Sequence, residues 1–97
     1  MERRSRSDYP AGVLGIYDGG SKCADRYTVV YTVERAIGRR YFPYVGMSES
    51  PFHPQGVGMH GESRVRLTSR ECGRAISFDD LPEDCKQLVR QDLRTRI

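Results

Sequence analysis

Residues 26–34 read Arg-Tyr-Thr-Val-Val-Tyr-Thr-Val-Glu, which is the clearest strand pattern in the chain. β-branched and aromatic side chains dominate it, and such side chains favour the extended, pleated backbone of a strand. The pattern has a period of two, with Tyr27, Val29 and Tyr31 on one face and Val30 on the other. Because both faces carry apolar side chains, we expect this stretch to be a central strand of a sheet.

Two further strands are expected next to it in the chain. Val13 to Tyr17 is a short apolar run, and residues 39–47 alternate in the manner of a longer strand. Pro43 lies in the middle of the longer run and cannot donate a ladder hydrogen bond. We therefore expect that strand to lie at a sheet edge or to contain a bulge. Residues 36–38 are predicted to form the turn that precedes it.

The region after residue 62 is less regular. Residues 64–68 alternate polar and apolar side chains, which predicts a half-buried strand. Residues 71–74 are typical of a turn, although a helical turn near residues 69–72 also fits. One more short strand is expected at residues 75–78.

A helix is predicted at residues 81–95. Asp80 with Glu83 three residues later has the spacing of a capping box. Cys85 lies within the apolar stripe of this helix, so we interpret it as a small core side chain and not as a reactive thiol. The stripe that should cover a sheet face consists of Leu81, Cys85, Leu88, Val89 and Leu93.

Together these elements predict an α+β fold. We expect a small antiparallel sheet of three to five strands, with the C-terminal helix packed on one face. Residues 11–97 would form a single α+β domain, a reasonable size for one modest core. Residues 1–10 are polar and basic, and they are predicted to be a disordered arm.

Composition narrows the class of protein. Hydrophobic residues make up 37% of the chain, and no run approaches the length of a membrane span. Three cysteines without a Cys-x-x-Cys pair fit a reduced, cytoplasmic chain better than a disulfide scaffold. The net charge is +3, and almost all the basic residues are arginines, which suit phosphate and carboxylate recognition. Acidic residues interrupt the basic ones, so no long basic stripe forms.

The most unusual stretch is residues 48–62, Ser-Glu-Ser-Pro-Phe-His-Pro-Gln-Gly-Val-Gly-Met-His-Gly-Glu. Its prolines and glycines fit neither a helix nor a strand, so an irregular loop is predicted. Long loops in small domains are usually functional or disordered, and the aromatic and imidazole groups favour an ordered functional loop. We expect it to lie against one end of the sheet, near Asp25, Arg26 and Tyr27.

Three kinds of chemistry are open to this loop. His53, His60 and Glu62 could hold a transition metal, although their spacing matches no standard zinc motif. A histidine could instead act as general base, with Ser48, Ser50 or Ser63 as nucleophile and Asp25 or Glu62 as the orienting carboxylate. No nucleophile-elbow motif accompanies them. The pattern Gly-x-Gly-x-x-Gly at residues 56–61 lacks the strand–turn–helix setting of a dinucleotide site.

The predicted sheet also suggests nucleic-acid binding. Arg26 precedes Tyr27 at the start of one strand, and Arg40 precedes Tyr41 at the start of another. Arginine beside tyrosine on a sheet can contact phosphates and stack on bases, as single-strand binders do. Half-buried packing of the tyrosines explains the same pattern.

Three stretches resemble a family of small uncharacterised proteins from bacteria, phages and other mobile elements. They are Asp25–Val30, Ser48–Glu62 and Ile76–Cys85, of which the middle one is the most specific. The resemblance spans nearly the whole chain from Val13 and implies a bacterial or phage cytoplasm. It brings no activity, cofactor or catalytic residue. Family members often carry Ser-x-Asn-Pro in the loop, whereas this chain has Ser50 before Pro51.

The leading functional expectation is a small cytoplasmic, non-enzymatic interaction module that binds a protein or nucleic-acid partner through residues 48–62 and modulates a host system. A small hydrolase or metal-dependent enzyme using His53, His60 and Glu62 is the first alternative, and a single-strand nucleic-acid binder is the second. The sequence assigns no cofactor. The residues expected at the binding site are Asp25, Arg26, Tyr27, Ser48, Ser50, Phe52, His53, Gln55, His60 and Glu62.

Overall fold

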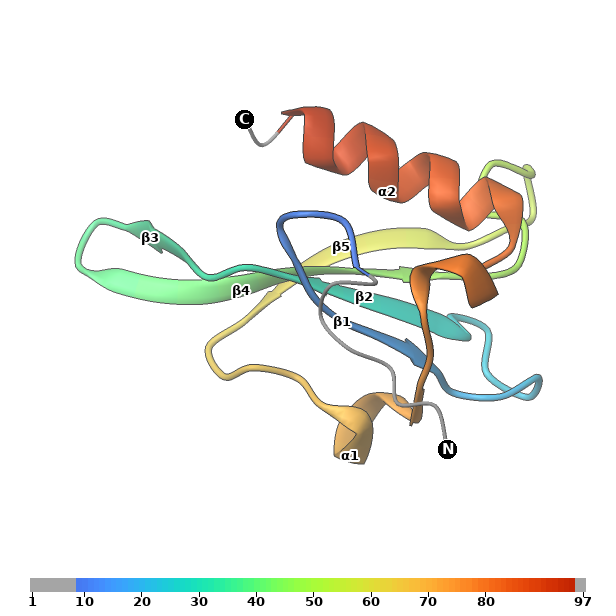
Figure 1. The fold of residues 1–97 in the computed structure, drawn as a ribbon, viewed down its shortest axis with the longest axis horizontal. Helices are drawn as coiled ribbons and strands as arrows, with labels where there is room; N and C mark the ends of the chain where they lie inside the picture. The colour runs from blue at the N-terminus through green and yellow to red at the C-terminus, as the bar shows by residue number, and fades with distance from the viewer. Residues whose placement is uncertain (1–8, 96–97) are drawn as a thin grey trace.

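The computed structural model describes residues 9–95, and within them a sheet lies between a long helix and a shorter helical segment (Figure 1). Residues 1–8 of the predicted arm lie outside the described residues, whereas Tyr9 packs against the core. The elements are β1 (Val13–Asp18), β2 (Tyr27–Tyr31), β3 (Glu34–Ala36), β4 (Arg39–Met47), β5 (Gly58–Ser63), α1 (Ser69–Cys72), β6 (Arg74–Ala75), the 3₁₀ helix η2 (Phe78–Asp80) and α2 (Glu83–Thr95).

The strands of residues 9–95 form one six-stranded antiparallel sheet, which confirms the predicted α+β class with more strands than the three to five expected. The order is β3-β4-β2-β1-β6, and β5 pairs with β4. The same residues of β4 pair with both β2 and β5, so these two strands lie on opposite edges of β4. The strand predicted over residues 26–34 is central, but it ends at Tyr31.

A break in register occurs in the middle of β4. The pairing of β4 with β2 ends at Val30 opposite Tyr44, and its pairing with β3 begins at Glu34 opposite Tyr41. Three residues on one side therefore face two on the other, as in a β-bulge. Pro43 lies at this break. Of the two alternatives predicted for Pro43, the edge strand is wrong because β4 is paired along both edges. The extra residue of the break lies within residues 31–33 and not on β4.

Helix α2 covers one face of the sheet, and the core lies beneath it. The predicted apolar stripe is confirmed: Leu81, Cys85 and Val89 are buried, and Leu88 and Leu93 pack against them. At full burial each larger side chain of the stripe contributes about 1.5–3 kcal/mol to the free energy of unfolding.

No helix within residues 9–95 is long and apolar enough to cross a membrane.

The predicted start of this helix is wrong. Asp80 belongs to η2, and its carboxylate accepts a hydrogen bond from the backbone N–H of Ser77 at 3.1 Å. Helix α2 itself begins at Glu83, with the carbonyl of Pro82 accepting from the N–H of Lys86. Asp80 therefore caps the preceding turn, and Leu81 and Pro82 connect it to the helix.

The opposite face of the sheet is covered by the segment that contains α1 (Figure 1). The strand predicted at residues 64–68 is wrong, because these residues leave the sheet after β5 and pass beneath it. Arg66 donates from Nη2 to the carbonyl of Leu14 at 3.2 Å, which ties the segment to β1. Their burial does not alternate: Arg64, Val65 and Thr68 are exposed, whereas the adjacent Arg66 and Leu67 are half buried.

Strand β5 lies where an irregular loop was predicted, so the predicted extent of the loop is wrong. Position 61 of this strand requires glycine, because a Cβ there would lie 2.6 Å from the ring of Tyr44 on β4. The aromatic ring fills the space that a side chain would occupy, and it packs across the strand pair. The irregular loop is confined to residues 48–57.

This packing yields a stability prediction. Replacing Gly61 with alanine forces Tyr44 or the strand to move, and we expect a loss of about 1–3 kcal/mol of unfolding free energy. Chemical denaturation of Gly61→Ala measures this loss. Gly58→Ala in the same strand is the matched control, because a Cβ at Gly58 meets its nearest neighbours at 3.4 Å, an ordinary contact. Equal losses in the two variants would contradict the assigned role of Tyr44.

Candidate functional site

The loop of residues 48–57 is tied together by hydrogen bonds of its own. Ser48 and Val57 close its base: the Ser48 N–H donates to the Val57 carbonyl, and the Val57 N–H donates to Ser48 Oγ, both at 2.9 Å. Within the loop, the N–H of His53 donates to the carbonyl of Ser50, and the N–H of Gly56 donates to that of His53. A Cβ at Gly56 would collide with the Ser50 carbonyl, so only glycine allows this turn. The loop is therefore an ordered structure.

Arg26 holds the loop against the connection between β1 and β2. Its guanidinium forms two hydrogen bonds with Asp18, Nε to Oδ1 at 2.8 Å and Nη2 to Oδ2 at 3.0 Å. Its remaining nitrogen, Nη1, reaches Glu49 of the loop at 3.0 Å. The guanidinium also lies over the ring of Tyr27, 5.0 Å from the ring centre. One side chain thus joins the sheet end to the loop.

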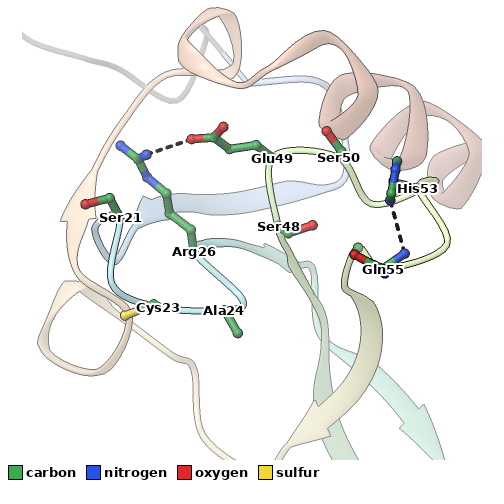
Figure 2. Close-up of a pocket in the computed structure, with 10 residues that line it drawn as sticks. Ser21, Cys23, Ala24, Arg26, Ser48, Glu49, Ser50, His53 and Gln55 are labelled. Atoms are coloured by element: carbon green, nitrogen blue, oxygen red, sulfur yellow. Dashed lines mark hydrogen bonds and ion pairs between the residues drawn. The ribbon is translucent and has the colours of Figure 1, made fainter.

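A pocket opens between this connection and the loop. Its volume is about 520 Å³, within the range of small-ligand sites. Figure 2 shows the Arg26 side chain extending from one wall to Glu49 on the other. The pocket is lined by Ser21, Cys23, Ala24, Arg26, Ser48, Glu49, Ser50, His53, Gln55 and Gly56.

The structure brings half of the predicted site residues together in this pocket. The expected placement of the loop beside Arg26 is observed. The residues assembled there are Arg26, Ser48, Ser50, His53 and Gln55. The residues that sequence reasoning missed come from the β1–β2 connection and from the loop itself: Ser21, Cys23, Ala24, Glu49 and Gly56. The contact between Arg26 and Glu49 could have been predicted from their opposite charges, since one lies at the start of a strand and the other in the loop expected beside it.

The hydrogen bond of the His53 ring determines which of its nitrogens can donate to a ligand. Its Nδ1 accepts from the backbone N–H of Gln55 at 3.1 Å, as Figure 2 shows. In the neutral ring the proton is therefore on Nε2. The exposed nitrogen is then a hydrogen-bond donor and not a base. The pocket accordingly presents donors from His53 and Gln55, hydroxyl groups from Ser21 and Ser50, and the Glu49 carboxylate.

Three predicted residues near the pocket do not line it. Tyr27 is buried in the core beneath α2. Asp25 lies against Gly46 of β4 and lines a different hollow beside α1. Phe52 is an exposed residue of the loop, and its ring is not part of the pocket wall.

His60 and Glu62 lie on β5, away from the pocket. His60 Nε2 lies 2.9 Å from both carboxylate oxygens of Asp92 on α2. The same carboxylate accepts a hydrogen bond from the buried hydroxyl of Tyr31 at 2.6 Å. This cluster joins β2, β5 and α2, so it fastens the helix to the sheet. Glu62 forms a 3.6 Å ion pair with Arg39, and both side chains are half exposed.

The described residues offer no ready metal centre. Within residues 9–95 no three histidine, cysteine, aspartate or glutamate side chains lie close enough together to hold an ion. His53 lines the pocket, whereas His60 and Glu62 line a separate hollow on β5. The three residues proposed as metal ligands are therefore not assembled in this structure.

Two of the strand tyrosines are not available as a stacking platform for a single-stranded nucleic acid. Tyr27 and Tyr31 are buried beneath α2, at 6% and 0% exposure. Tyr41 is half buried and donates to Glu34 at 3.0 Å. Bases can stack only on an exposed ring face.

Cys85 supports the loop from beneath. Its thiol is buried and donates to the carbonyl of Ser48 at 3.1 Å. Burial raises the pKa of this thiol to about 12, so it stays protonated at neutral pH. Its predicted role as a core side chain and not a reactive thiol agrees with this position. Cys23, in contrast, is exposed in the pocket wall.

The Asp18–Arg26 pair gives the site a pH dependence. The Arg26 guanidinium lowers the pKa of Asp18 below its ordinary value of 3.8. A lowered folded-state pKa contributes stability that is present above the unfolded-state pKa and is lost as pH falls through the folded-state pKa. We expect Asp18→Asn to reduce stability at pH 7 and to flatten the pH dependence below about pH 4. Urea unfolding across a pH series measures both.

The exposed carboxylate Asp79 supplies the control for this experiment. Asp79→Asn removes one negative charge from the surface without touching Arg26. If Asp79→Asn flattens the acid limb as much as Asp18→Asn does, the Arg26 contact is not the cause.

Comparison with protein-family models, with curated proteins and with solved structures found no match to this chain. The resemblance to small bacterial and phage proteins therefore stays a prediction, and the site is interpreted from its own geometry.

Proposed function

We propose that this protein is a small, non-enzymatic interaction module that binds a segment of a partner protein in the pocket between the β1–β2 connection and the 48–57 loop. The observation that carries the proposal is an ordered loop whose hydrogen bonds hold polar side chains at the rim of an open pocket. Preorganised side chains bind with less loss of conformational entropy than mobile ones.

The charges of the pocket favour a protein segment over nucleic acid. Arg26, the basic residue in the wall, already contacts the carboxylates of Asp18 and Glu49. A phosphate would have to compete with both carboxylates for one guanidinium. The remaining groups are amide, hydroxyl and imidazole donors and acceptors, which match the backbone and polar side chains of a peptide.

No specific observation favours the hydrolase alternative. A Ser–His pair needs the histidine nitrogen to accept the nucleophile's proton. Here Nδ1 of His53 already accepts from Gln55, and no hydrogen bond joins His53 to a serine hydroxyl among the described residues. Peptide binding by His53 and the pocket serines requires no proton transfer between them.

The proposed setting is the cytoplasm of a bacterium or phage-infected cell, where the module would modulate a host system. The three free cysteines support a reducing compartment, since one of them is exposed. The bacterial or phage setting rests on the sequence resemblance.

Selection from a random peptide library on the immobilised protein, followed by calorimetry with the selected peptide, tests the proposal. We expect His53→Ala and Gln55→Ala each to weaken binding of that peptide at least fivefold, because each removes a hydrogen-bonding group from the rim. Amide NMR shifts on peptide addition should concentrate in residues 21–26 and 48–56.

His60→Ala is the matched control, since it removes the other imidazole without touching the pocket. Affinity that is unchanged in this variant and reduced in His53→Ala supports the pocket. Failure to select any peptide, or NMR shifts confined to another surface, would refute the proposal.

A further inference from the structure

The hairpin of β3 and β4 projects from the body of the protein as a two-stranded arm (Figure 1). We define the arm as residues 34–41. It extends from the end of the sheet opposite the 48–57 loop, and β3 pairs with no strand other than β4 among the described residues. The Tyr41–Glu34 hydrogen bond closes its base, and Arg39, next to the turn, lies over the Tyr41 ring and pairs with Glu62.

Two features of the arm are unfavourable for its stability: the backbone conformation of Ile37 at the tip, and the repulsion between two arginines on the strands. Ile37 is fully exposed and has a φ of 42°, in the left-handed region that β-branched residues avoid. Both central residues of the turn, Ile37 and Gly38, have positive φ, a geometry that favours Asn-Gly. Such local strain at an exposed position is characteristic of functional sites.

The second unfavourable feature is the repulsion between two positive charges. Arg35 and Arg40 lie directly opposite each other on the two strands, and both are exposed. Like charges at opposed positions repel and destabilise a hairpin. Neither arginine has an ion-pair partner within residues 9–95. With Arg39, three arginines flank one exposed isoleucine.

We propose that this arm binds double-stranded DNA, with Arg35 and Arg40 on the phosphates and Ile37 as an apolar wedge against the bases. β-Ribbon proteins place their strands in the major or the minor groove of duplex DNA. Architectural DNA-binding proteins insert apolar side chains between base pairs and kink the duplex, with arginine or lysine alongside. The repulsion between Arg35 and Arg40 is relieved when a polyanion lies between them. A lone isoleucine is a small anchor for a membrane, so lipid explains the tip less well.

The experiment measures binding of the full protein to a labelled 24-base-pair duplex by fluorescence anisotropy, over about 25–200 mM salt. We expect a negative slope of log affinity against log salt. The double variant Arg35→Gln/Arg40→Gln should reduce the magnitude of this slope by about 2 and weaken binding at least tenfold at the lowest salt. Lys22→Gln/Arg70→Gln is the charge-matched control, with both changes at exposed positions off the arm.

Ile37→Asn separates the wedge from the charges. It should leave the salt slope unchanged and abolish duplex bending, measured by energy transfer between dyes at the two duplex ends. Both arm variants should unfold at the same temperature as the unmodified protein or higher, because they remove strain or repulsion. Weaker binding with undiminished stability is the signature of a functional arm.

Three results would overturn the proposal: no duplex binding, equal losses in the arm and control variants, or a preference for other ligands. The other ligands are the same sequence as single strand or RNA duplex, heparin, and vesicles of phosphatidylserine with phosphatidylcholine. Vesicle binding that Ile37→Asn abolishes, without duplex binding, would assign the arm to a membrane surface instead.

Discussion

The Arg26 guanidinium is the contact on which the site depends. Its Nε and Nη2 donate to Asp18 at the end of β1 and its Nη1 donates to Glu49 in the loop, while the guanidinium lies over the ring of Tyr27. A lysine at this position offers a point charge and lacks the planar fork that binds one carboxylate with two nitrogens. Without this contact the loop would keep its internal hydrogen bonds but lose its ion pair to the sheet. Arg74 approaches the same Asp18 carboxylate at 3.5 Å and adds to the charge balance.

Much of the fold could be predicted because the decisive strands have strong local patterns. The period of two over residues 27–31 and 39–47, and the helical stripe before Thr95, are properties of neighbouring residues. Strand β5 could not be predicted because its glycines are unfavourable in strands taken alone. Gly61 is favourable there because the Tyr44 ring on the adjacent strand occupies the space of a side chain at position 61. This is a tertiary contact that the local sequence does not reveal.

The candidate site was predictable only in part, for a similar reason. The loop stood out through its prolines, glycines and histidines, and its contact with Arg26 was expected from the position of that residue at a strand end. His60 was grouped with His53 because they are near in sequence, yet β5 carries His60 to the face covered by α2. Its partner Asp92 is 32 residues further along the chain, and no local pattern links them.

Residues 48–57 are held in one conformation by their own hydrogen bonds and form a wall of a preformed pocket. Backbone ¹⁵N relaxation of the free protein measures the rigidity of this loop, because it reports order on the picosecond-to-nanosecond scale for each residue. We expect order parameters for residues 49–56 close to those of β2 and β4, about 0.85. Values below about 0.6 across the loop, with β2 and β4 rigid, would contradict this expectation.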